Sequence, residues 1–134
     1  EMGVDELSLG DTIGVATPRQ VEAVLNSLLK RFPKEKLSMH FHDTRGTALA
    51  NVLLSLEMGI TTFDSSLGGL GGCPYAPGAS GNVATDDLLY MLHGMDIATG
   101  IDAGRLTEAA LFIQNKIGRA LNSHYLQTVD PCLS

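Results

Sequence analysis

The chain repeats a strand-then-helix unit three times, and this repeat constrains its fold more than any other feature. The units follow one another at intervals of about 25 to 30 residues, the spacing expected where parallel strands alternate with helices. In the first unit, residues 7–11 read as a strand, and Thr17-Pro18-Arg19-Gln20 supplies an N-cap, a proline at N1 and a glutamine at N3. The following helix stops at Phe32-Pro33. Its apolar stripe consists of Val21, Val24, Leu25, Leu28 and Leu29.

In the rest of the chain, fewer residues mark where the helices and strands begin and end. The predicted elements there are strands at residues 37–41 and 60–65 and helices at 47–58, 85–93 and 103–121. Gly59 is a plausible C′ residue for one helix, and Asp102 a cap for another. A glycine-rich passage, residues 68–81, separates the last strand from the helix after it. Ordered loops of this length are uncommon and often functional, so we expect the passage to belong to a site.

Composition and charge exclude several classes of partner. The 134 residues are 44% hydrophobic and 18% charged, as in a globular domain. A net charge of -6 provides no basic surface for nucleic acid or anionic membrane, and no apolar run approaches the roughly 18 residues of a membrane span. We expect a small-molecule partner and a cytoplasmic location, or a mitochondrial one if a targeting segment was lost with a missing N-terminus. Cys73 and Cys132 should both be thiols there.

The second predicted strand carries two histidines, and alternation along a strand turns them to the same face. We expect Ser38, His40 and His42 to point together at the carboxyl end of the strand, where barrel folds keep their active sites. Two imidazoles so placed can bind one cation. The alternative is one buried and one surface histidine, each satisfied by hydrogen bonds. The residues expected to pack outward against helices are Leu37, Met39 and Phe41.

Acidic residues lie at the ends of the other strands. Asp11 ends the first predicted strand and Asp64 lies near the end of the third, so both could approach the same mouth of a parallel barrel. An aspartate at a strand end is also common as a turn or helix-cap residue, and Asp43 could likewise serve only the turn after its strand.

The glycine-rich passage contains two further candidates. Its glycines could swing the Cys73 thiol towards a ligand, where it could exchange protons, although an inert packing role is also open. Asn82 could cap the next helix, the commoner use, or turn its carbonyl oxygen to a hard cation. A nucleotide-binding loop fits poorly, because there is no Gly-Lys-Ser/Thr ending and the glycines lie too far from the helix.

Four segments, taken together in their order and spacing, resemble the 3-hydroxy-3-methylglutaryl-CoA lyase family. They are residues 8–14, residues 40–46, Asp64-Ser65-Ser66 and residues 68–82, within a resemblance that runs from about Leu7 to about Leu121. The loop Gly-Gly-Cys-Pro-Tyr-Ala-Pro-Gly-Ala-Ser-Gly-Asn separates these lyases from the related isopropylmalate and homocitrate synthases. The resemblance implies an α/β fold, a partial (β/α)8 TIM barrel. Residues 1–134 would form the C-terminal portion of the lyase domain, about its last three βα units plus C-terminal helices, with the N-terminal strands absent.

The implied activity is the carbon–carbon lyase reaction that cleaves 3-hydroxy-3-methylglutaryl-CoA, an acyl-CoA substrate, to acetyl-CoA and acetoacetate with Mg²⁺ or Mn²⁺. By resemblance, His40, His42 and Asn82 are metal ligands, and Cys73, Asp11 and His40 are catalytic. Cys73 would donate a proton to the departing enolate, and Asp11 would act as a base or an orienting group at the substrate hydroxyl.

The family's first strand supplies an arginine and a metal-binding aspartate, and no residue of this chain can be assigned to either. We therefore expect a homo-oligomer or association with a missing N-terminal half. The alternatives are a non-catalytic barrel module and a lyase-like enzyme or synthase that acts on a related acyl-CoA.

Overall fold

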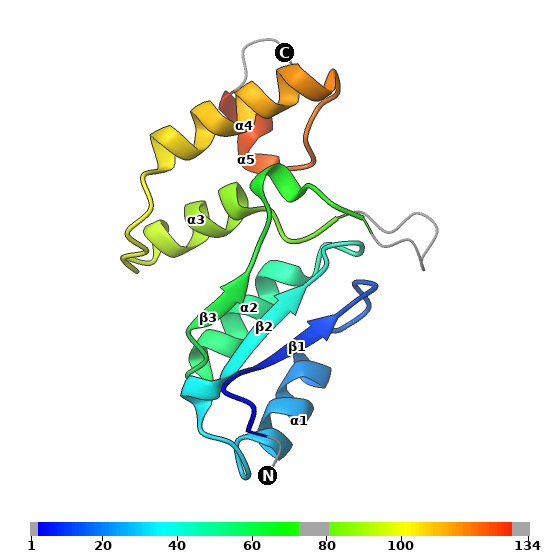
Figure 1. Ribbon diagram of the computed structural model, residues 1–134, viewed down its shortest axis with the longest axis vertical. Helices are drawn as coiled ribbons and strands as arrows, with labels where there is room; N and C mark the ends of the chain where they lie inside the picture. Colours follow the sequence, from blue (N-terminus) through cyan, green and yellow to red (C-terminus); the bar gives the residue numbers. More distant parts are fainter. Residues whose placement is uncertain (1–2, 73–80, 130–134) are drawn as a thin grey trace. The chain divides into compact units, whose positions relative to one another are not determined.

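The computed structural model describes residues 3–72 and 81–129, and these form two compact units (Figure 1). The first unit contains residues 3–64, and the second contains residues 65–72 and 81–129. Within the described ranges, no helix is long and apolar enough to cross a membrane.

The first unit is built on a parallel sheet whose strands lie in the order β1 (Leu7–Asp11), β2 (Leu37–Phe41) and β3 (Thr62–Asp64). The predicted parallel strands are confirmed. β3 is shorter than residues 60–65, because the Ile60 N–H bonds the Ser55 carbonyl at 3.0 Å and cannot join the strand ladder. Ile60 is instead completely buried.

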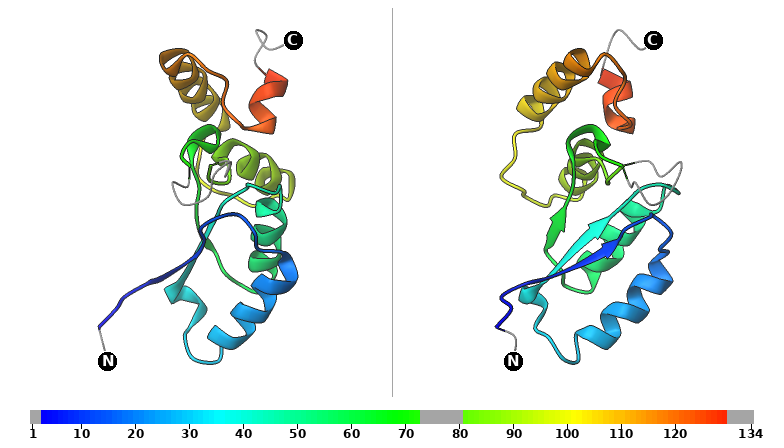
Figure 2. Two further views of the ribbon diagram at one scale, coloured as in Figure 1. Left: turned by 90° about the vertical axis from the view of Figure 1, so that its right-hand side faces the viewer. Right: turned by 45° about the vertical axis from the view of Figure 1, so that its right-hand side comes forward.

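Two helices, α1 (Pro18–Leu28) and α2 (Ala48–Glu57), lie on the same face of this sheet (Figure 2). As predicted, Gln20 closes the capping box of α1 by accepting from the Thr17 N–H at 2.9 Å, and Gly59 follows α2 with φ +92°. Within the predicted apolar stripe of α1, Val21 and Leu25 are buried, whereas Val24 is 51% exposed. The side chains that the strand turns toward the helices are buried as predicted: Leu37, Met39 and Phe41. Burial of each contributes about 1.5–3 kcal/mol to folding.

The second unit contains α3 (Thr85–Gly94), α4 (Ala103–Ile117) and α5 (His124–Val129). Asp102 caps α4 as predicted, because its Oδ1 accepts from the Arg105 N–H at 3.0 Å. α4 ends before the predicted Leu121, since Gly118 adopts a left-handed φ of +68° and stops the helix. Leu121 then packs with Ala110 and Leu126 in a small apolar cluster.

The short helix α5, which the sequence did not predict, is held by Asp87 of α3. Asp87 Oδ1 accepts from Ser123 Oγ and from the Tyr125 N–H, both at 2.7 Å, and Oδ2 accepts from the His124 N–H at 3.1 Å. A helix of six residues is not stable by itself, so these charge-assisted bonds define it.

A fourth extended segment, also missed by the sequence, precedes α3. The Ser66 N–H bonds the Val83 carbonyl at 3.1 Å, and the Thr85 N–H bonds the Ser66 carbonyl at 2.9 Å. This is a parallel bridge between Ser66 and Ala84. It places residues 81–84 beside the chain that follows β3 within the second unit.

Asp86 is a buried carboxyl at the start of α3. Its Oδ2 accepts from the Gly68 N–H at 2.6 Å, whereas Oδ1 is buried with no hydrogen-bond partner among the described residues. Burial raises the pKa of Asp86 above its ordinary value. The Asp86 carboxyl therefore holds the beginning of the glycine-rich passage in place. Its burial disfavours the ionised form of the carboxyl.

We predict that Asp87→Asn releases α5 and lowers the free energy of unfolding by about 2–4 kcal/mol, because an amide NH₂ would face the N–H and O–H donors that now converge on the carboxylate. Urea unfolding and limited proteolysis of residues 122–129 would measure this. The exposed Asp5→Asn substitution is the control. An unchanged midpoint and unchanged proteolysis in the Asp87 variant would show that α5 does not depend on this residue.

A second prediction concerns pH. Because the folded-state pKa of Asp86 is raised, its contribution to stability is present in full below the ordinary value of 3.8 and is lost as the pH rises through the folded-state pKa. The difference in unfolding free energy between wild type and Asp86→Asn should therefore fall as the pH rises from below 3.8 towards neutrality. Urea titrations across this range test the sign. A difference that rises with pH would contradict the assignment.

Candidate functional site

The carboxyl ends of the three parallel strands bring polar residues to one edge of the first unit. Asp11 is the last residue of β1, His42 directly follows β2, and Asp64 is the last residue of β3. In open parallel α/β sheets, ligands bind outside this edge. The arrangement matches the expectation drawn from the sequence.

His40 and His42 converge, with ring centroids 5.1 Å apart and an edge-on angle of 63° between the rings. His42 is only 6% exposed, and its Nδ1 is buried without a hydrogen-bond partner among the described residues. The alternative of two histidines satisfied by hydrogen bonds therefore does not describe His42. An unpartnered buried nitrogen costs about 1–3 kcal/mol, so a ligand at that atom would offset a real penalty.

The charge state of His42 suits a metal ligand. Burial lowers its pKa, neighbouring His40 lowers it further, and Asp11 acts in the opposite direction. The imidazole is therefore neutral near pH 7, which is the form that binds cations. In the described part of the chain, no three His, Cys, Asp or Glu side chains gather as a metal site, so other oxygen donors are needed to complete the coordination of a hard cation.

Asp64 lies near His40, with 3.8 Å between its Oδ2 and the His40 Nδ1. This distance is too long for a hydrogen bond. Both side chains are partly exposed, at 33% for His40 and 59% for Asp64, so their attraction is screened by water. Asp64 thus lies at the mouth of the site as predicted, but it does not hold the His40 ring in one orientation by a hydrogen bond.

The Asp11 carboxylate is held by the turn that follows β1. Its Oδ1 accepts from the Val15 N–H at 3.0 Å and its Oδ2 from the Ala16 N–H at 2.9 Å. The turn role that the sequence left open is therefore present. Each oxygen keeps a further lone pair, so the same carboxylate can accept from a substrate hydroxyl.

The loops after β1 and β2 are bonded to each other by residues that sequence reasoning missed. Arg45 Nη1 donates to the Gly14 carbonyl at 3.0 Å, and the Ala16 carbonyl accepts from Thr47 Oγ1 at 2.9 Å and from Asn51 Nδ2 at 3.0 Å. Asn51 occupied an ordinary helix position in the sequence, with no signal of this role. These bonds fix the loop of Asp11 against the loop that follows His42.

Asp43, directly after His42, has the turn role given as its alternative, because its Oδ1 accepts from the Ala48 N–H at the start of α2. It therefore fixes the beginning of that helix rather than extending the cluster of candidate ligands.

In the second unit, Asn82 is not the cap of α3, whose N-cap is Ala84. The Asn82 Nδ2 instead donates to the Leu70 carbonyl at 3.0 Å, and the amide oxygen is the acceptor of the group. A Cβ on Gly81 would meet the Gly69 and Gly71 carbonyl oxygens, so only glycine fits this close approach. Cys73 lies outside the described residues.

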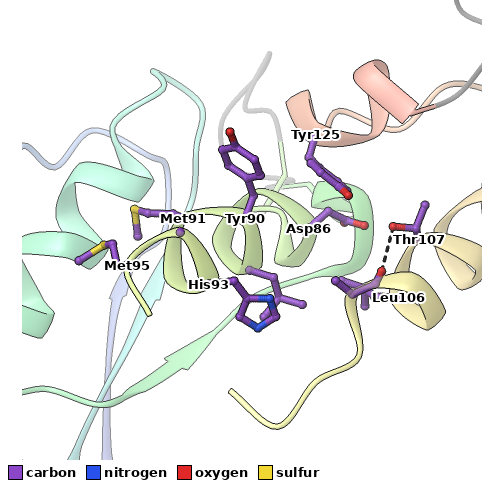
Figure 3. Close-up of a pocket in the computed structure, with 11 residues that line it drawn as sticks. Asp86, Tyr90, Met91, His93, Met95, Leu106, Thr107 and Tyr125 are labelled. Atoms are coloured by element: carbon purple, nitrogen blue, oxygen red, sulfur yellow. Dashed lines mark hydrogen bonds between the residues drawn. The ribbon is translucent and has the colours of Figure 1, made fainter. Parts of the chain in front are cut away.

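Two hollows accompany these elements. One of about 260 Å³ lies between the sheet and α1, with Asp11 among its lining residues. The other, of about 500 Å³, lies on α3, α4 and α5 and contains none of the predicted site residues (Figure 3). Its lining includes the tilted ring pair Tyr90 and Tyr125, whose centroids are 5.7 Å apart, with Met91 and Met95 at one end.

Comparison with known proteins places these features in a family context. The HMGL-like family model matches residues 1–113. The hydroxymethylglutaryl-CoA lyase YngG of Bacillus subtilis is 61% identical over 127 residues, which are 95% of this chain and 42% of that protein. The chain thus spans under half the length of such relatives.

Solved structures agree with this match. A Bacillus subtilis HMG-CoA lyase crystal structure has a TM-score of 0.91 at 60% identity and covers 95% of this chain and 43% of its own. An Acinetobacter baumannii HMG-CoA lyase in complex with coenzyme A and 3-methylmalate has a TM-score of 0.88 at 40% identity and covers 96% and 42%. The predicted fold class is confirmed: the parallel βα units are part of a (β/α)8 barrel.

The turn that holds Asp11 can be tested at Gly14, which has φ +62° and whose added Cβ would lie 2.8 Å from the Thr44 backbone nitrogen. Gly14→Ala should lower the free energy of unfolding by about 2 kcal/mol or more. Thermal denaturation would measure it.

Two control substitutions separate the strain of a positive φ from a steric clash of the added Cβ. Gly46→Ala should cost only about 1 kcal/mol, because Gly46 has φ +70° and its added Cβ would meet no atom of the described residues within 4 Å. Gly10→Ala, whose nearest contact is 3.7 Å, should be nearly neutral. Equal losses for Gly14 and Gly46 would mean that the contact with Thr44 does not constrain this turn.

Proposed function

The chain belongs to the HMGL-like family, and we propose that it supplies the metal-holding and proton-transfer part of a hydroxymethylglutaryl-CoA lyase. The reaction cleaves 3-hydroxy-3-methylglutaryl-CoA to acetyl-CoA and acetoacetate. The observation that carries the proposal is the buried His42 Nδ1 without a partner among the described residues, beside His40 at the carboxyl ends of the strands. Because the chain matches 42% of the Bacillus subtilis relative, the complete site would also need residues from the rest of a barrel.

The HMGL-like family depends on divalent metals. We assign His40, His42 and Asn82 as the residues that hold Mg²⁺ or Mn²⁺. Their chemistry fits this role, because His42 is neutral with a buried nitrogen that has no partner among the described residues, and Asn82 offers an amide oxygen, a donor that hard cations accept. When bound, the cation supplies a positive charge that stabilises the alkoxide of the substrate.

Asp11 acts at the substrate hydroxyl, as the base that takes its proton or as the acceptor that orients it. The two N–H bonds from Val15 and Ala16 hold the carboxylate in one orientation, which favours a single approach of the hydroxyl. The hydroxyl gives its proton to Asp11 or, where Asp11 only orients the group, to another base of the complete site. As the hydroxyl oxygen becomes a carbonyl, the carbon–carbon bond breaks and its electron pair forms the thioester enolate. The Cys73 thiol then donates the proton that converts the enolate to acetyl-CoA.

The ligands of a relative support the substrate class. The Acinetobacter baumannii structure contains coenzyme A together with 3-methylmalate, which is a hydroxy diacid. We therefore propose that this chain also addresses the hydroxy-acid end of an acyl-CoA. A lyase acting on a related acyl-CoA is the second candidate, because the same residues would recognise that shared end.

The activity can be tested in a chimera in which this chain replaces the matching part of the Bacillus subtilis relative. We expect the chimera to release acetoacetate from 3-hydroxy-3-methylglutaryl-CoA in the presence of Mg²⁺. A folded chimera that binds metal yet releases no acetoacetate would contradict the proposed reaction, and cleavage of only a related acyl-CoA would support the second candidate.

We predict that His42→Ala in this chimera weakens Mn²⁺ binding by about tenfold or more, because a first ligand is lost. Isothermal titration calorimetry measures the affinity. The matched control is His93→Ala, since His93 is an exposed histidine bonded to Thr99 in the second unit. Equal Mn²⁺ affinity in wild type and the His42 variant would remove His42 from the ligand set.

We also predict that Cys73→Ala in the chimera lowers kcat by about 100-fold or more, the size expected when a general acid is lost, while the melting temperature is retained. Cys132→Ala is the matched control, because Cys132 is the other cysteine of the chain. A lower melting temperature with turnover intact would give Cys73 a structural role instead.

A further inference from the structure

Asn51 is a polar side chain placed where packing alone would favour an apolar one. It lies on α2, is 0% exposed, and has Val52, also 0% exposed, as its neighbour. Its Oδ1 is buried without a hydrogen-bond partner in the described part of the chain. An amide oxygen in this position destabilises the fold relative to an aliphatic residue of similar size. The residue therefore calls for an explanation other than stability.

The NH₂ group of the Asn51 side chain is bonded to the turn that holds Asp11 of the candidate site. Asn51 Nδ2 donates to the Ala16 carbonyl at 3.0 Å. The N–H of the same Ala16 donates to Asp11 Oδ2 at 2.9 Å. Ala16 is thus bonded on one side to the interior of α2 and on the other side to the Asp11 carboxylate.

Thr47 makes a second bond to the same carbonyl, with 2.9 Å between Thr47 Oγ1 and the Ala16 oxygen. Both donors come from the segment that follows His42, since α2 begins seven residues after Phe41 and Thr47 is its N-cap. The Ala16 carbonyl is therefore held by α2 and its N-cap, which restrains the backbone torsions of Ala16 and, through them, the N–H that donates to Asp11.

We propose that Asn51 is a positioning residue that orients the Asp11 carboxylate through Ala16. It makes no contact with substrate or metal. The buried Asn51 NH₂ donates to the Ala16 carbonyl, and the amide oxygen beside it is left unpaired among the described residues. That unpaired oxygen lowers the stability of the fold. The proposal rests on the proposed function only where Asp11 is taken to act on the substrate, because the bonds from Asn51 to Asp11 belong to this chain whatever the reaction.

The chain offers a matched control on the same helix. Ser55 lies one turn beyond Asn51, is also 0% exposed, and donates through Oγ to the Asn51 carbonyl at 2.7 Å. Ser55→Ala therefore removes a buried polar group of α2 without touching Ala16. Thr47→Val removes the second donor to Ala16, and Thr47→Ser restores it.

The test is amide hydrogen exchange in the 134-residue chain, followed by NMR at Val15 and Ala16, whose N–H groups donate to Asp11. In Asn51→Leu, we expect these two amides to exchange about tenfold faster relative to the amides of β2, with global stability equal or higher. Thr47→Val should act in the same direction, and Thr47→Ser and Ser55→Ala should leave both amides near their wild-type rates. If Asn51→Leu does not fold, the two Thr47 variants decide by the same comparison.

Unchanged exchange at Val15 and Ala16 in both Asn51→Leu and Thr47→Val would overturn the proposal. A uniform increase across β2 as well would overturn it too, because it would mean a structural role only. In the chimera, Asn51→Leu should lower kcat more than it raises KM and leave Mn²⁺ affinity unchanged. Absence of lyase activity in the unsubstituted chimera would count against the proposed function alone, since the exchange result does not depend on turnover.

Discussion

The parallel pairing of β1 with β2 is the constraint on which the candidate site depends. Its register sets Asp11 opposite Phe41, so the carboxylate and the buried His42 ring come to the same edge of the sheet. A slip of one residue would turn every strand side chain to the other face, and His40 and His42 would point into the helices. The buried Leu37, Met39 and Phe41 oppose such a slip, because they would then lose their contacts. The packing of the core thereby determines which side chains come together at the carboxyl ends of the strands.

The regular parts of this arrangement could be predicted from the sequence because their signals are local. Alternation predicted the face shared by His40 and His42, and a capping pattern predicted the start of α1. The errors came from contacts between distant residues. The Ser55 carbonyl removes Ile60 from β3, and Asp87 of α3 creates the short helix α5. No periodicity reports such bonds.

The role of Asn82 also depended on a long-range contact. Its position before a helix predicted either a cap or a cation ligand. The cap is excluded because Ala84 is the N-cap of α3, while Asn82 Nδ2 donates to the distant Leu70 carbonyl. Among the described residues, the buried polar atoms without partners are His42 Nδ1, Asn51 Oδ1 and Asp86 Oδ1. His42 belongs to a predicted site segment, and Asn51 and Asp86 lie a few residues beyond one. A buried polar atom without a partner lowers stability, so its presence in a folded protein points to a function. The amino-acid composition does not reveal such atoms.

The proposed function requires that His40 and His42 hold one divalent cation beside Asp11. Pulsed electron paramagnetic resonance of Mn²⁺ bound to the chimera tests it most directly, because couplings to nitrogen nuclei report imidazole ligands. We expect couplings from two histidine nitrogens, reduced to one by substitution of either His40 or His42. A bound Mn²⁺ with no nitrogen coupling, in a chimera that still cleaves the substrate, would contradict it.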